Sequence, residues 1–264
     1  MNAELAMRLT VGLAAVGVAI SSLEYLLRPG LLADDALASW SVTRTSHAWM
    51  VTPRAEAMLE RLFAYPNFAV VLVLRLLAAA AVMVGPPLPL AALAALIAVS
   101  SSLLAQRSPY GTDGADQLTV IIFVGAALSE AIATPNSYKL FLWFISAQAC
   151  LAYLTAGVAK LASPVWREGG ALPGILGTSS YGYRRLGAVL ARHQRTFWTL
   201  GWLIMALECV FPTALLGIRP LTYTMLAAML TFHLGAAFLM RLNTFFWAFT
   251  ATYPSILFCA LGSP

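Results

Sequence analysis

The stretch NFAVVLVLRLLAAAAVMV, residues 67–84, decides what kind of protein this chain folds into. It is apolar from one end to the other, and Arg75 near its middle is its only charged residue. A run of about 20 such residues is long enough to cross the hydrocarbon core of a bilayer as an α-helix. The stretch therefore predicts a transmembrane helix.

The composition of the whole chain agrees with this local pattern. Of its 264 residues, 60% are hydrophobic and only 10% are charged, whereas a soluble domain carries about 25% charged residues. The mean hydropathy is +0.80. Because so few charges cannot cover so much apolar surface in water, a soluble enzyme, a nucleic-acid-binding protein and a disordered chain are all excluded.

Seven further apolar segments resemble residues 67–84, and turn residues separate them. Helices are expected because each lone segment in lipid must satisfy its own backbone hydrogen bonds. We predict an all-α, polytopic membrane protein with one transmembrane domain over residues 1–264 and no separate soluble domain. The eight predicted spans are Met7–Leu27, Asn67–Val84, Leu88–Ala105, Gln117–Ala133, Tyr138–Leu161, Phe197–Leu216, Leu221–Met240 and Asn243–Leu261.

Two connections, 28–66 and 162–196, are long enough to hold short helices at the membrane surface. In the first, Thr52 and Pro53 are typical of a helix start, and an apolar face follows through Met58, Leu59, Leu62 and Phe63. In the second, Leu186, Val189 and Leu190 share a helical face that is flanked by arginines.

Basic residues are unevenly distributed between the connections. Eleven Lys and Arg residues fall after the first, third, fifth and seventh segments, and three fall on the other side. The positive-inside rule therefore predicts that both long connections face the cytoplasm. We expect the chain to lie in the cell (inner) membrane. The cysteines Cys150, Cys209 and Cys259 all lie inside apolar segments, which favours packed, reduced thiols.

Ionisable residues within the spans are candidates for function, because burying a charge in lipid is costly. Arg75, Glu208, Glu24 and His233 are such residues. One interpretation pairs Arg75 with Glu24 or Glu208 as an ion pair between helices, and the other gives Arg75 a direct role. A lone buried histidine such as His233 is either a packing residue or a functional one.

A polar stretch, 110–117, precedes the fourth segment and contains Asp113 and Asp116. Aspartates at such a position are typical of a helix N-cap. Two carboxylates three residues apart can also hold a cation or orient a base.

Tyr153, Gly157 and Lys160 fall at positions i, i+4 and i+7, which share one face of a helix. Gly157 would allow another group to approach the backbone closely. Lys160 lies just before Pro164, so one interpretation is a lysine whose amine reaches the membrane surface and the helix C-terminus. The other is a partly desolvated lysine, in which burial favours the neutral amine that can act as a base.

The run 152–160, with Trp166, Gly169 and the stretch 177–182 after it, resembles the horizontally transferred transmembrane (HTTM) domain. This is the membrane part of vitamin K-dependent gamma-carboxylase and of its bacterial relatives. His233 to Gly235, the run 243–246 and Pro254 are similar to that family's last two helices.

The resemblance implies a chemistry in which a lysine deprotonates a reduced naphthoquinone that then reacts with oxygen. Lys160 matches that lysine. The resemblance further implies supporting roles for His233, Asp113 and Asp116, and a quinone site near Tyr153, Gly157, Trp166 and Arg75. The implied cofactor is a lipid quinol of the vitamin K or menaquinol type, and no metal is expected.

The chain also departs from the carboxylase. Residues 112–116 stand where the carboxylase has Asn-Asn-His, and its large extramembrane domain has no counterpart. We therefore expect an enzyme that uses a quinol and oxygen to modify a peptide or small substrate, not necessarily by carboxylation. The alternatives are a non-catalytic maturation or chaperone partner for a secreted peptide, and a transporter with Arg75 as its anion site. The expected partners are membrane lipid and such a peptide, but no nucleic acid.

Overall fold

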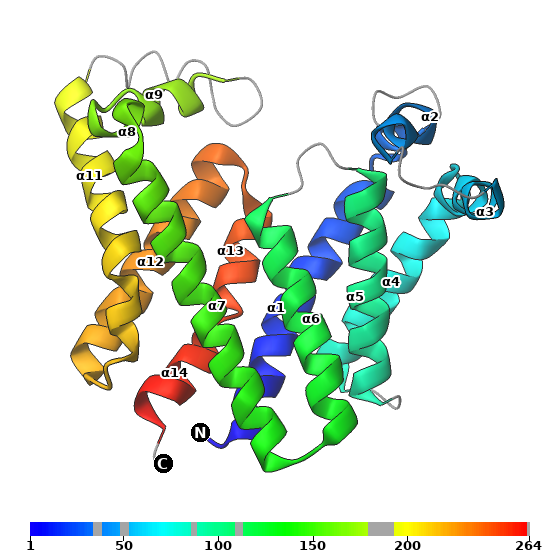
Figure 1. Cartoon of the computed structure of the whole chain (residues 1–264), viewed down its shortest axis with the longest axis horizontal. Helices are drawn as coiled ribbons and strands as arrows, with labels where there is room; N and C mark the ends of the chain where they lie inside the picture. The colour runs from blue at the N-terminus through cyan, green and yellow to red at the C-terminus, as the bar shows by residue number, and fades with distance from the viewer. Residues whose placement is uncertain (34–38, 48–52, 86–88, 109–112, 179–192, 263–264) are drawn as a thin grey trace. The chain divides into compact units, whose positions relative to one another are not determined.

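The computed structural model describes residues 1–33, 39–47, 53–85, 89–108, 113–178 and 193–262. Within these ranges every regular element is helical (Figure 1). Eight helical segments are long and apolar enough to cross a membrane, which confirms an all-α, multi-pass membrane protein. They are α1 (Ala3–Leu26), α4 (Asn67–Val84), α5 (Leu90–Arg107), α6 (Gly114–Ile132), α7 (Pro135–Ala162), α11 (Gln194–Val210) with η3 (Phe211–Leu215), α12 (Arg219–Met240), and α13 (Asn243–Thr250) with α14 (Tyr253–Leu261).

Two of the predicted spans are not continuous α-helices. The sixth tightens into the 3₁₀ helix η3 at Phe211, and the eighth is interrupted between Thr250 and Tyr253. In both cases a proline, Pro212 or Pro254, occupies the first turn of the new segment. Proline has no N–H and cannot continue a preceding helix without disrupting it.

The short helix predicted in the first long connection is confirmed as α3 (Pro53–Phe63). Part of the apolar face of α3 is covered, because Phe63 is buried against Trp40 and Phe68, and Leu59 and Leu62 pack around them, whereas Met58 is exposed. Most of the second predicted surface helix, including Leu186, Val189 and Leu190, lies outside the described residues. The other short helices are η1 (Pro29–Leu31), α2 (Trp40–Thr43), η2 (Arg44–His47), α8 (Pro164–Arg167) and α9 (Ala171–Leu176).

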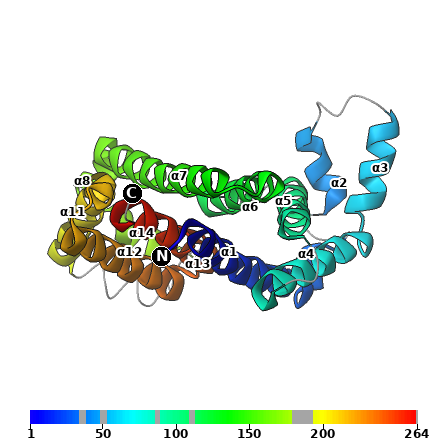
Figure 2. The same ribbon diagram turned by 90° about the horizontal axis from the view of Figure 1, so that it is seen from below.

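The chain divides into two compact units. Unit 1 comprises Met1–Thr10 and Tyr138–Pro264, and unit 2 comprises Val11–Ser137. Unit 2 packs α4 and α6 against α5. In unit 1, α12 lies against α11 and against α13, as Figure 2 also shows. The single transmembrane domain expected from the sequence stays a prediction.

Candidate functional site

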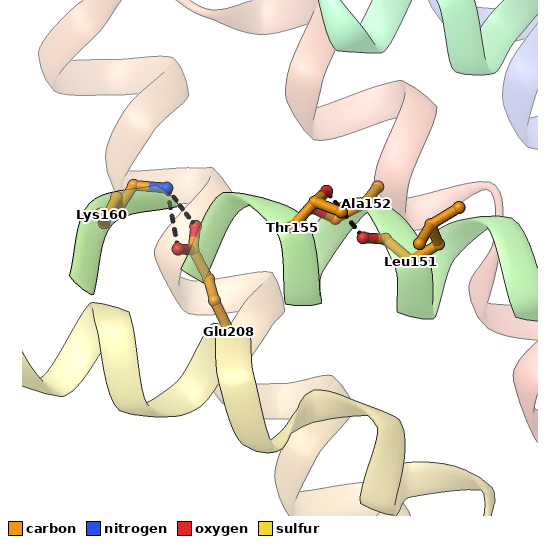
Figure 3. A network of polar contacts seen from close by, with 5 residues as sticks. All are labelled: Leu151, Ala152, Thr155, Lys160 and Glu208. Carbon is orange, nitrogen blue, oxygen red and sulfur yellow. Dashed lines mark hydrogen bonds and ion pairs between the residues drawn. The ribbon is translucent and has the colours of Figure 1, made fainter. Parts of the chain in front are cut away.

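Lys160 and Glu208 form a buried ion pair between α7 and α11. The Nζ atom of Lys160 donates hydrogen bonds to both carboxylate oxygens of Glu208 at 2.8 Å (Figure 3). The Lys160 side chain is 20% exposed and that of Glu208 only 4%. Nζ also lies 5.3 Å from the centre of the Trp166 ring on α8, which is within the range of a cation–π interaction.

The pair forms because α7 and α11 approach each other closely at Gly157. A Cβ atom at this position would lie 2.7 Å from Sγ and 2.9 Å from the backbone nitrogen of Cys209. Any larger residue would therefore push α11 away. The close approach that the sequence predicted at Gly157 is made by Cys209, next to Glu208 in the chain.

The position of Glu208 along α11 sets the depth of the ion pair. Trp198 and Trp202 are partly exposed near the start of α11, and tryptophan side chains favour the headgroup level of a membrane. Glu208 follows them by ten and six residues, which is about 15 and 9 Å at 1.5 Å per residue. Lys160 itself stands in the last turn of α7 and keeps 20% of its side chain exposed. Both interpretations of Lys160, an amine near the membrane surface and a desolvated base, therefore stay predictions.

The segment after α7 packs beside the first half of α11. Trp198 donates a hydrogen bond from Nε1 to the carbonyl of Arg167 at 2.9 Å. Leu172 and Leu176 of α9 pack against Phe197 and Ile204. Gly169 has a φ of +83°, and a Cβ there would lie 3.0 Å from that of Trp198. Glycine is therefore required where α8 turns into α9.

Two turns of α7 before Lys160, Tyr153 meets His233 of α12. The Tyr153 hydroxyl and the Nε2 atom of His233 are 2.8 Å apart, and both side chains are 2% exposed. The imidazole stacks on Phe249 at 4.7 Å, while the Tyr153 ring contacts Phe211 at 4.1 Å. Among the described residues, the Nδ1 atom of His233 has no hydrogen-bond partner although it is buried.

The two polar pairs belong to one layer of unit 1. Glu208 is close enough to Tyr153, and Lys160 to His233, for electrostatic interaction. The prediction that Tyr153, Gly157 and Lys160 share one helical face is confirmed, because all three contact α11, α12 or η3. We call Tyr153, Lys160, Glu208 and His233 the polar layer.

Asp113 and Asp116 begin α6, in unit 2, as a capping box. The Asp113 carboxylate accepts hydrogen bonds from the backbone N–H of Ala115 at 2.8 Å and of Asp116 at 3.2 Å. The Asp116 carboxylate accepts one from the backbone N–H of Asp113 at 3.3 Å. Burial, and then the charge of Asp116, raise the pKa of the Asp113 carboxyl above its ordinary value. The N-cap interpretation is confirmed, and a catalytic role for either aspartate stays a prediction.

Arg75, also in unit 2, does not form the ion pair with Glu24 that one interpretation of the sequence predicted. Glu208, the other partner considered, belongs to unit 1. The Arg75 guanidinium donates from Nε to the Ser101 hydroxyl at 3.0 Å and from Nη1 to the Ser22 hydroxyl at 2.9 Å. Glu208 instead pairs with Lys160. The reason is that hydroxyl groups on α1 and α5 lie within reach of the arginine, and the sequence pattern alone did not reveal them.

The sequence analysis named Glu208 as a candidate for function and as one of two partners for Arg75, but it missed the place of Glu208 beside Lys160. The available signal was charge balance, because an acid and a base inside apolar segments of similar depth are expected to pair. No protein-family model, curated protein or solved structure matches this chain.

Proposed function

We propose that the protein is an integral membrane enzyme that uses a reduced lipid quinone and oxygen to modify a peptide or small substrate, with Lys160 as the base. The observation that carries this proposal is the ion pair of Lys160 with Glu208, held inside an apolar span. Ionisable groups inside apolar spans are costly and are retained mainly where they serve a function.

The ion pair gives Lys160 a way to become neutral. A base must hold a free lone pair, and the Nζ atom lies 2.8 Å from both carboxylate oxygens of Glu208. In a medium of low dielectric constant two opposite charges are poorly solvated. Transfer of one proton from Nζ to Glu208 therefore leaves an amine and a carboxylic acid, both uncharged.

The neutral amine can then accept a proton from an acidic hydroxyl group placed next to it. The O–H bond breaks, an N–H bond forms, and the resulting ammonium stabilises the oxygen anion. A bound quinol would supply that hydroxyl and the reducing equivalents for the reaction with oxygen. The centre of the Trp166 ring lies 5.3 Å from Nζ, and one fifth of the Lys160 side chain stays exposed, which leaves the amine open to a substrate.

An aromatic cluster lies on the same face of α7, two turns before Lys160. Tyr153 packs there against Phe211 and Phe249, and all three rings are buried. The buried, unpaired Nδ1 atom of His233 needs a hydrogen-bond partner that the described residues do not supply. We assign Tyr153, Trp166 and His233 to the support of the substrate, while the roles of Gly157, Arg75, Asp113 and Asp116 in binding or catalysis remain those implied by the resemblance.

The second candidate is a non-catalytic maturation partner or chaperone for a secreted peptide. It is favoured by the completeness of the ion pair, since both carboxylate oxygens of Glu208 are hydrogen-bonded. Polar contacts of this kind also serve simply to join helices. In that case the polar layer has a purely structural role.

The substitution Lys160→Arg separates the two candidates. Arginine keeps the positive charge and can still pair with Glu208, but it stays protonated and cannot act as a base. We expect oxygen-dependent consumption of menaquinol by the purified protein to fall about 10²- to 10⁴-fold. Lys160→Ala should show the same loss.

A matched control is Lys139→Arg, which changes an exposed lysine of the same helix. It should leave the rate unchanged. If Lys160→Arg retains most of the activity, Lys160 is not the base. If the wild type consumes no quinol and co-purifies with a secreted peptide, the chaperone candidate is correct.

A further inference from the structure

Arg75 of unit 2 stands outside the polar layer and has an unusual environment for a buried cation. Its side chain is 4% exposed. No ion pair joins it to a carboxylate within the described part of the chain. Its hydrogen-bond partners are all neutral: the hydroxyls of Ser21, Ser22 and Ser101 and the carbonyl of Val18.

A count of donors and acceptors shows what this cluster lacks. The guanidinium has five N–H donors, and its hydrogen bonds to the described residues come from Nε and Nη1 alone. Nη2 therefore has no acceptor among the described residues. The hydroxyls of Ser101 and Ser21 accept from Arg75, and neither donates to another described group. Ser22 uses its own hydrogen on the Val18 carbonyl at 2.7 Å.

The cluster thus combines a positive charge with several unused donors. A guanidinium flanked by hydroxyls matches the oxygens of a carboxylate or phosphate, and free donors beside a charge favour such an acceptor. The position of the cluster near the ends of α1 and α5 allows an anion to reach it from the membrane surface. Ser22 lies four residues before the end of α1 and Ser101 six before the end of α5, or about 6 and 9 Å at 1.5 Å per residue.

Asp116 and Tyr25 are the groups that act electrostatically on Arg75. The Asp116 carboxylate is already an acceptor within the capping box of α6. It balances the charge of Arg75 from a distance, yet it leaves the donors on Nη2, Ser21 and Ser101 unmet. Its negative charge must weaken the attraction of the cluster for any second anion.

We propose that Arg75, Ser21, Ser22 and Ser101 form a binding site for an oxyanion, namely the phosphate of an anionic lipid or a free phosphate. The proposal rests on contacts within unit 2 and not on the quinol chemistry proposed for Lys160. It gives Arg75 a role other than the quinone contact that the resemblance implies. Arg75 provides the charge, Nη2 and the two serine hydroxyls provide the hydrogen bonds, and Asp116 tunes the affinity.

The test is binding to the purified full chain in a non-ionic detergent. Inorganic phosphate is titrated at constant ionic strength, and phosphatidylglycerol is titrated against phosphatidylcholine, with the thermal unfolding midpoint as the readout. Stabilisation by phosphate identifies a free oxyanion. Stabilisation by phosphatidylglycerol alone identifies a lipid headgroup.

Variants test whether the stabilisation by phosphate or phosphatidylglycerol depends on this cluster. Loss of a hydrogen bond to a charged group costs about 1.5–3 kcal/mol, so Arg75→Gln should weaken binding roughly 10- to 100-fold. Ser101→Ala should weaken it by a smaller factor. Asp116→Asn keeps an acceptor at the helix start but removes a negative charge, so it should tighten binding.

The control is Ser102→Ala, because Ser102 is exposed and donates to the Ala98 carbonyl. It should bind like the wild type. If Arg75→Gln fails to fold, the proposal is still tested by the opposite effects expected on binding, weaker in Ser101→Ala and tighter in Asp116→Asn. The proposal is overturned if neither probe stabilises the wild type, or if Ser101→Ala and Asp116→Asn both bind as tightly as Ser102→Ala.

Discussion

Gly157 is the residue on which the geometry of the polar layer depends most directly. In Gly157→Ala the new methyl group would meet Cys209 at 2.7 Å, and overpacking of this kind costs typically 1–3 kcal/mol. We expect a lower unfolding midpoint in detergent, and a lower activity because Lys160 and Glu208 are forced apart.

Gly235→Ala on α12 is the natural comparison, since a Cβ at Gly235 would meet nothing within 4 Å. That variant should be neutral or more stable, because alanine favours a helix over glycine by up to about 1 kcal/mol. Equal midpoints for the two variants would contradict the close helix approach at Gly157.

At the residue scale, spacing within one helix was predictable and pairing between helices was not. The positions of Tyr153, Gly157 and Lys160 on one face follow from the helical repeat alone. The partner of Lys160 lies 48 residues further along the chain. The identity of this partner depends on how α7 and α11 pack, and the spacing of residues within one segment does not reveal that packing.

At the scale of an element, the start of α6 depends on the capping box of Asp113 and Asp116. Replacing an N-cap aspartate by alanine costs about 1 kcal/mol, whereas asparagine is nearly as good a cap as aspartate. We therefore expect Asp113→Ala to lower the unfolding midpoint and Asp113→Asn to leave it almost unchanged. If both variants are equally destabilised, the charge of Asp113 matters more than its role as a cap.

The spans themselves were predictable to within a few residues, because the apolar length needed to cross a bilayer is fixed. Asn67–Val84 was predicted with both ends correct. The interruptions at Pro212 and Pro254 were not predicted. Hydropathy does not register them, since a 3₁₀ turn or a broken helix can be as apolar as a straight one.

At the scale of the whole molecule, eight spans require that successive connections alternate between the two sides of the membrane. Basic residues concentrate in the connections after odd-numbered spans, and the positive-inside rule places that side in the cytoplasm. The resemblance to the carboxylase implies the opposite orientation for the Lys160 end of α7. The charge distribution is the stronger argument, because these connections are short enough for the rule to apply.

A reporter that is active only outside the cytoplasm tests this orientation. We expect it to be inactive when inserted after Arg184 and active when inserted after Gly217, in the connection before α12. The reverse pair of results would show that the carboxylase-like orientation is correct. Equal activity at both sites would contradict the span assignment itself.

The separation between Lys160 and Glu208 also affects how the chain is made. Lys160 leaves the ribosome 48 residues ahead of Glu208. At about 5–20 residues per second, the lysine remains without its partner for about 2–10 s. During that interval its amine must stay near water or be shielded by the insertion machinery. Completion of α11 is therefore the event that allows this end of α7 to settle into the lipid.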